Sequence, residues 1–172
     1  MILYTFVLML PVVVIAFITR QKGAGLVKIT VGILLGIISA FAAFYTINSI
    51  RIFVSSSILF LIVPFIEELF KLVAVYVFAE SNEEYSRTSC FLIPAGFAML
   101  ENALLTSPNN MQLLFLRSFT SLPVHLVASG FYIMSLHKMQ ESEEKVTARL
   151  GLAFLSAYGL HTCYNLLIRF LA

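Results

Sequence analysis

Eight polar side chains interrupt stretches of sequence that are otherwise apolar. They fall into four groups along the chain: Glu67, Glu68 and Lys71; Glu101 and Asn102; His125; and His161 with Asn165. Carboxylates, imidazoles and an amide are the groups that activate water and stabilise the oxyanion formed when an amide bond is attacked. The combination therefore predicts hydrolysis, with a carboxylate as the general base.

The spacing within these groups places several of the side chains on one helical face. Lys71 follows Glu67 by four residues and Glu68 by three, so its ammonium can reach either carboxylate. Glu67 and Glu68 diverge by about 100° around a helix, so we expect one to act and the other to support it. His161 and Asn165 are four residues apart and share a face.

Other hydrolytic mechanisms lack their usual motifs here. The sequence has no G-x-S-x-G, no suggestive Ser–Lys pair and no cysteine with an evident base, which disfavours serine and cysteine chemistry. It also lacks H-E-x-x-H, although Glu and His from separate helices could still hold a metal in a bundle. These residues by themselves leave open whether a metal is bound, and they indicate no other cofactor.

The elements that must position these groups are membrane-spanning helices. The chain has 172 residues, of which 60% are hydrophobic and 12% charged, too apolar for an ordinary soluble domain. Six apolar runs approach the ~20 residues that cross a bilayer. They cover 2–19, 29–50, 52–66 with a continuation to 79, 89–100, 118–136 and 150–168. We expect an all-α, polytopic bundle of about six transmembrane helices, forming one domain over 1–172 with its motifs in 64–165.

The four polar groups are expected at one depth in the membrane. Glu68, Glu101, His125 and His161 are each 12 or 13 residues from the cytoplasmic edge of their helices. That is about 18–20 Å at ~1.5 Å per residue. An ionisable side chain at the bilayer centre costs ~2.5–3.5 kcal/mol, so several at one level indicate a shared function. Taken singly, each also has a structural explanation, such as an ion-paired helix end or a hydrogen-bonded histidine in the bundle.

Basic residues in the short loops predict the orientation. Loops one, three and five hold seven: Arg20, Lys22, Lys28, Arg87, Lys138, Lys145 and Arg149. The opposite side holds three: Arg51, Arg117 and Arg169. The excess predicts a multi-pass protein of the cell membrane with both termini outside the cytoplasm.

A net charge of +2 without a basic stripe gives no indication of nucleic-acid binding. A stripe of small residues in 29–50 (Gly32, Gly36, Ala40 and Ala43) predicts a helix-packing surface.

Four motifs in order carry a family resemblance: EELFK (67–71), FAMLEN (97–102), HLVASG (125–130) and HTCYN (161–165). The sequence resembles the PrsW family of intramembrane proteases, whose pattern is E-E-x-x-K, F-x-x-x-E-N, a His and H-x-x-x-N on successive helices. That family is grouped with the type II CAAX prenyl endopeptidases, also called the Abi or CPBP superfamily. Lys71 and Glu101 stand where the CAAX branch has Arg and His, which favours the PrsW branch.

The resemblance implies a glutamate-dependent, metal-independent endopeptidase that cleaves a membrane-anchored protein. Its nearest analogy is site-1 cleavage of a single-pass anti-sigma factor. It implies that Glu67 is the general base, that Glu68 supports it, and that Lys71 tunes this pair. Glu101, which shares a motif with Asn102, would orient water or substrate. His161 with Asn165 would form the oxyanion site, and His125 would complete the polar cluster.

Three alternatives remain open from the residues. A metal-dependent protease of the same superfamily would use the same acids and imidazoles. A proton-coupled transporter is possible because intramembrane Glu, His and Lys also mark ion paths, although no internal repeat is visible. A non-catalytic scaffold or immunity protein is the third. The partners expected for the protease are its membrane-anchored substrate and the lipid bilayer, without nucleic acid.

Overall fold

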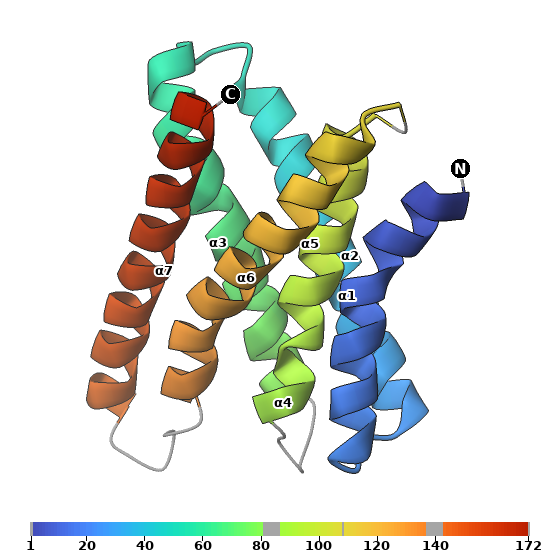
Figure 1. Ribbon diagram of the computed structural model, residues 1–172. Helices are drawn as coiled ribbons and strands as arrows, with labels where there is room; N and C mark the ends of the chain where they lie inside the picture. Colours follow the sequence, from blue (N-terminus) through green and yellow to red (C-terminus); the bar gives the residue numbers. More distant parts are fainter. Residues whose placement is uncertain (1, 81–86, 108, 137–142, 172) are drawn as a thin grey trace.

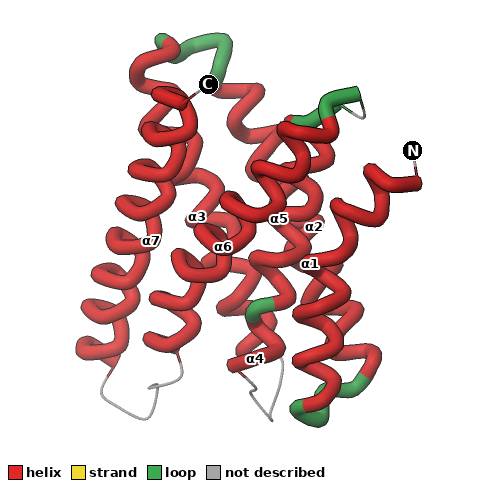
Figure 2. The backbone as a smooth tube through the Cα atoms, in the orientation of Figure 1, coloured by secondary structure: helices red, strands yellow, loops and turns green. Residues whose placement is uncertain are grey.

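The computed structural model describes residues 2–80, 87–107, 109–136 and 143–171, and all of its regular elements there are helices (Figure 2). They are α1 (Ile2–Gln21), α2 (Leu26–Ile50), α3 (Ser56–Glu80), α4 (Arg87–Cys90), α5 (Leu92–Leu105), α6 (Met111–Leu136) and α7 (Glu143–Leu171). Only Phe91 separates α4 from α5. The predicted all-α helix bundle is confirmed.

The long helices alternate in direction along the chain (Figure 1). The start of α1 and the end of α7 consequently lie at the same end of the bundle, uppermost in Figure 1, which we call the termini end. The opposite end holds the end of α1, the end of α3 and the end of α6, and we call it the loop end. The chain passes from one end of the bundle to the other an even number of times, so it finishes at the end where it started.

Four helical segments are long and apolar enough to cross a membrane: Leu3–Gln21, Leu26–Ile50, Arg87–Leu105 and Met111–Leu136. The other two long helices, α3 and α7, have 25 and 29 residues, so they match a bilayer in length as well. Their polar side chains in mid-helix make them less apolar. Large hydrophobic side chains are exposed on most of these helices, as expected where lipid is the solvent. The chain is a multi-pass membrane protein.

The start of α6 differs from the sequence prediction. The apolar run 118–136 indicated a helix, but α6 begins at Met111, where the Asn110 side chain accepts a hydrogen bond from the backbone N–H of Leu113 at 3.0 Å. Arg117, which was predicted to lie in a loop on the outer side, therefore lies two turns inside a helix. Polar residues in the first two turns of α6 interrupt the apolar pattern, so the sequence did not indicate that these turns are helical.

Helices α2 and α5 approach each other closely through glycines. A Cβ atom added at Gly36 would overlap the carbonyl oxygen of Ile93, and one added at Gly96 would lie 2.5 Å from the carbonyl oxygen of Ile33. Ala40 and Ala43 continue the buried face of α2. The small-residue stripe is thus a packing surface, as predicted, and it sets the position of the helix that carries Glu101.

Substitution of Gly36 by Ala is expected to destabilise the fold by about 1–3 kcal/mol, because the added methyl group meets backbone that no side-chain rotation can move. The measurement is thermal unfolding in detergent. Gly151→Ala is the matched control, since nothing lies within 4 Å of a Cβ there. It should be neutral or stabilising by up to about 1 kcal/mol. Equal stability of the two variants would contradict the close contact.

Candidate active site

Helix α3 brings two carboxylates and an ammonium into the interior of the bundle. Glu68 and Lys71 are fully buried, and Glu67 is 7% exposed. The Nζ atom of Lys71 lies 2.5 Å from Oε1 of Glu68, three residues earlier on the same helix. Lys71 could have reached either acid by spacing alone. The structure pairs it with Glu68, which leaves Glu67 free to face another direction.

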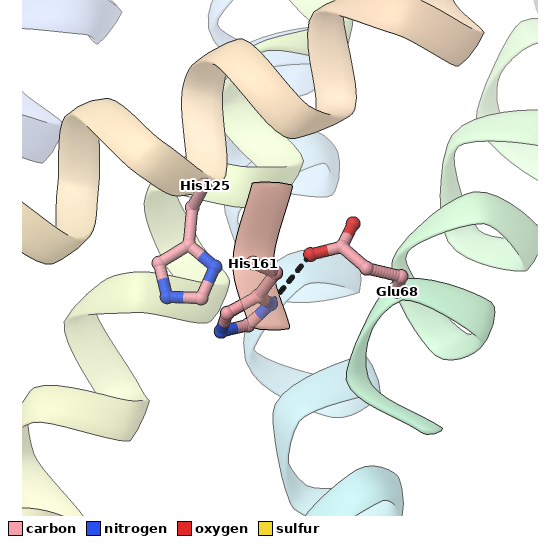
Figure 3. Close-up of side chains that lie close together, drawn as sticks. All are labelled: Glu68, His125 and His161. Atoms are coloured by element: carbon pink, nitrogen blue, oxygen red, sulfur yellow. Dashed lines mark hydrogen bonds and ion pairs between the residues drawn. The ribbon is translucent and has the colours of Figure 1, made fainter. Parts of the chain in front are cut away.

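Two histidines from other helices complete this pair. His125 of α6 places Nδ1 2.8 Å from Lys71 Nζ, and His161 of α7 places Nδ1 2.7 Å from Glu68 Oε1. Figure 3 shows the side chains of Glu68, His125 and His161 converging from three separate helices. Both imidazoles are 1% exposed. One buried ion pair therefore joins α3, α6 and α7.

Two hydroxyl groups of α6 extend this network, and sequence reasoning missed both. The hydroxyls of Ser129 and Tyr132 lie 2.5 Å apart, and Tyr132 donates to Oε2 of Glu68 at 3.4 Å. Both residues are fully buried. Ser129 follows His125 by four residues, so its place on the same face was the available signal. We call the set Glu68, Lys71, His125, Ser129, Tyr132 and His161 the inner cluster.

The second ring nitrogen of each histidine points to a different carboxylate. Nε2 of His125 lies 2.6 Å from Oε2 of Glu101, and Nε2 of His161 lies 3.3 Å from Oε2 of Glu67. The two imidazoles meet edge to face, with ring centroids 4.9 Å apart. Glu67, Glu68, Glu101, His125 and His161 therefore lie within one chain of contacts, at one level of the bundle.

Glu101 and Asn102 are held by an arginine that the sequence analysis had assigned to a loop. Arg117 of α6 donates from Nη2 to Oε1 of Glu101 at 2.6 Å and from Nε to Oδ1 of Asn102 at 3.1 Å. Ser121 donates to the same Asn102 oxygen at 3.3 Å. Asn102 is 3% exposed. It therefore positions Arg117 and Ser121 rather than contacting either histidine.

The hydrogen-bond partners indicate which ring nitrogens of the two imidazoles donate and which accept. An ammonium only donates, so Nδ1 of His125 accepts from Lys71 and the ring proton is on Nε2, facing Glu101. His161 donates from Nδ1 to the Glu68 carboxylate, and its Nε2 lies 3.3 Å from Oε2 of Glu67. Within the described residues, Oε2 of Glu67 has no hydrogen-bond donor. A buried carboxylate oxygen and an imidazole nitrogen thus lie side by side.

Glu67 and Glu101 line a cavity of about 240 Å³ between α2, α3 and α5. Its other walls are mostly apolar and include Ala40, Ala43, Phe44, Val63, Phe97 and Leu104. The cavity reaches Arg51 and Leu105, which lie near the termini end of α2 and α5. We call it the apolar cavity. It gives a mainly apolar polypeptide segment access to the two acids.

Asn165 lies elsewhere. It is one turn from His161 on α7, but it lines a separate cleft of about 360 Å³ between α3, α6 and α7. The lining residues are Ser56, Leu59, Phe60, Val63, Arg117, Tyr164, Asn165, Ile168 and Arg169. We call this the arginine cleft. The structure thus brings seven of the eight predicted residues into one polar network and places Asn165 beside it.

The order of these groups along the chain and their convergence match a known family. A family model described as PrsW family intramembrane metalloprotease matches residues 10–172. The chain belongs to this family. It is therefore a membrane-embedded protease by family, acting on protein substrates. No curated protein and no solved structure matches the chain.

The family description implies a metal, so we tested whether these residues fit one. In the described part of the chain one group qualifies: Glu68, His125 and His161 offer one donor atom each, all within 4.8 Å of one another. Two imidazoles and a carboxylate are suitable zinc ligands. However, the Lys71 ammonium already contacts Glu68 and His125. A divalent ion there would lie beside a fixed positive charge, so this side-chain arrangement does not fit a metal.

Removal of the Lys71 charge is expected to be costly. Lys71→Met leaves the Glu68 carboxylate buried without its ammonium partner, and breaking a buried ion pair costs about 3–5 kcal/mol. The measurement is the free energy of unfolding in mixed micelles. The double variant Lys71→Met with Glu68→Gln should recover most of this loss, because it removes both charges. If the double variant is as unstable as the single one, the pair does not organise the site.

Proposed function

We propose that this protein is an endopeptidase that cleaves a membrane-anchored, single-pass protein with water activated by Glu67. The observation that carries the proposal is the position of Glu67, a buried acid that lines the apolar cavity and whose Oε2 has no hydrogen-bond donor among the described residues. A base for water needs a free acceptor on a residue that borders the space the substrate enters. Glu68, the neighbouring acid, is already committed to Lys71 and His161.

The first step in this proposal is attack of water on the scissile carbonyl. Glu67 takes one proton from water while the water oxygen forms a bond to the carbonyl carbon, which gives a tetrahedral oxyanion. Glu101, held by Arg117 and His125, borders the same cavity and orients the water or the substrate. The second step breaks the C–N bond, and the leaving amine must receive a proton.

His161 is the group best placed to pass that proton on. Its Nε2 faces Glu67, and its Nδ1 donates to Glu68, an arrangement that stabilises an imidazolium once Nε2 is protonated. A protonated His161 can donate to the oxyanion or to the leaving amine. We propose Asn165, one turn away on the same helix, as the second oxyanion donor, reaching the substrate from the arginine cleft. Lys71 and His125 keep Glu68 and Glu101 in place.

Several features support a substrate that is itself anchored in the membrane. Glu67 is buried midway along α3, Glu101 is partly buried near the end of α5, and the apolar cavity suits aliphatic side chains. We extend the proposal to an anti-sigma-factor-like substrate, to an orientation with both termini outside the cytoplasm, and to kinship with the type II CAAX prenyl endopeptidases.

Substitution of Glu67 by Gln is expected to lower kcat by about 10²–10⁴-fold, because the amide cannot accept the proton from water. The assay follows cleavage of single-pass model substrates in liposomes. Glu80→Gln is the matched control, since Glu80 is an exposed acid at the end of the same helix. Its rate should equal that of the unmodified protein. Full activity in the Glu67 variant would exclude it as the base.

The reaction is expected to persist after metal removal, because Lys71 holds the position that an ion would need. The measurement combines elemental analysis of the purified protein with cleavage assays before and after treatment with a chelator. We expect less than one bound transition metal per chain and an unchanged rate. Loss of activity that is restored by a divalent ion would show that the metal-dependent alternative is correct.

A further inference from the structure

The arginine cleft carries positive charge that the site described above does not use. Arg117 is paired with Glu101. Arg169, in the last turn of α7, lies with its guanidinium carbon 5.9 Å from the centre of the Phe60 ring. Among the residues that the structure describes, Arg169 has no acidic partner, and the amide of Asn165 makes no hydrogen bond. The cleft therefore offers a guanidinium and an amide to a ligand.

The sequence supplies no acid of its own to this part of the molecule. All nine acidic residues are glutamates, and none occurs in 1–66, 102–140 or 145–172. Apart from Glu67, Glu68 and Glu101, they fall at positions 80–84 and 141–144, at or next to the connections between α3 and α4 and between α6 and α7. The cleft is lined by residues at the start of α3 and the end of α7, and these helix ends lie uppermost in Figure 1. None of the acidic side chains that the structure describes is paired with Arg169, so the cleft can take an anion from another molecule.

The cleft is adjacent to the reacting groups. Leu59 and Val63 line both the arginine cleft and the apolar cavity. Arg117 lines the cleft and donates to Glu101, which lines the cavity. Asn165 is one turn from His161, about 6 Å along the helix. An extended polypeptide covers that distance in about two residues at ~3.3 Å each.

We propose that the arginine cleft is a specificity subsite that binds an acidic side chain of the substrate, two to three residues from the scissile bond on the segment that leaves the site toward the termini end. The inference rests on the proposed function. A carboxylate there would accept charge-assisted hydrogen bonds from Arg169 and one from the second N–H of the Asn165 amide, whose first N–H serves the oxyanion. The substrate class is thus a single-pass protein with an acidic residue just outside the apolar segment that is cut.

A phospholipid headgroup is the other anion available at this depth, but the cleft favours a peptide. The cleft leads to Glu101 through Arg117, and its aliphatic wall continues into the apolar cavity. A headgroup would use the arginine alone. A peptide uses the arginine, the amide and the path to His161 together.

The experiment uses the full chain in nanodiscs of phosphatidylcholine and a set of fluorescent single-pass peptides. The peptides share one apolar segment and differ only in a flanking stretch, in which Glu or Gln occupies each position in turn. Binding is measured with the Glu67→Gln variant, so that no peptide is cut, and cleavage is measured with the unmodified protein. Arg169→Gln tests the subsite. Lys22→Gln removes an exposed positive charge outside both the arginine cleft and the apolar cavity.

We expect Glu to bind about tenfold more tightly than Gln at one or two adjacent positions only. Arg169→Gln should abolish that ratio, Lys22→Gln should preserve it, and Arg169→Glu should transfer the preference to Lys at the same positions. Equal affinity for Glu and Gln, or an equal loss with Lys22→Gln, would overturn the subsite. So would a Glu preference that disappears when phosphatidylglycerol replaces phosphatidylcholine, since a lipid headgroup would then occupy the cleft.

The two readouts separate the subsite from the proposed function. If Glu peptides bind tenfold more tightly through Arg169 but the unmodified protein cuts none of them, the subsite is supported and the proposed hydrolysis is not. If peptides are cut at rates that do not depend on Glu or Gln, the hydrolysis is supported and the subsite is wrong.

Discussion

The structure depends on one buried ion pair, between Lys71 and Glu68, in an interior where neither charge can reach water. Such charges are tolerated only when their hydrogen bonds are met by protein groups. Lys71 has further donors after contacting Glu68, and His125 accepts one of them. Glu68 has further acceptors, and His161 and Tyr132 donate to them. The need to satisfy one pair therefore fixes how α6 and α7 pack against α3.

This arrangement divides the polar residues into a supporting layer and a reacting layer. The Nδ1 atoms of both histidines are committed to the inner cluster, which turns both Nε2 atoms toward Glu67 and Glu101. Adjacent acids on one helix, about 100° apart, serve the two layers separately. Glu68 neutralises a lysine, while Glu67 faces the apolar cavity. The EE dipeptide thus gives one helix a structural acid and an acid that borders the cavity, which we propose as the base.

The sequence was sufficient for the helices and for most of the site, because polar residues in apolar runs are conspicuous. Glu67, Glu101, His125 and His161 were recognised by that contrast and by their common depth. Arg117 was assigned to a loop because a charged residue next to an apolar run usually marks the end of a helix. Its role in the site is shown by its hydrogen bonds to Glu101 and Asn102. Tyr132 is common in apolar helices and gives no such contrast. The direction of Asn165 depends on how α7 rotates against α3, which spacing along one helix does not determine.

The glycine contacts between α2 and α5 bear on how a substrate could enter. Gly36 and Gly96 bring backbone against backbone, with no flexible side chain between that could yield. Such backbone contact resists separation of the two helices, so the side of the apolar cavity that they form is the stiffer one. The remaining side belongs to α3, which bears Glu67. Widening the cavity is then easiest by displacement of the helix that carries the proposed base, which would couple admission of a polypeptide to the alignment of Glu67.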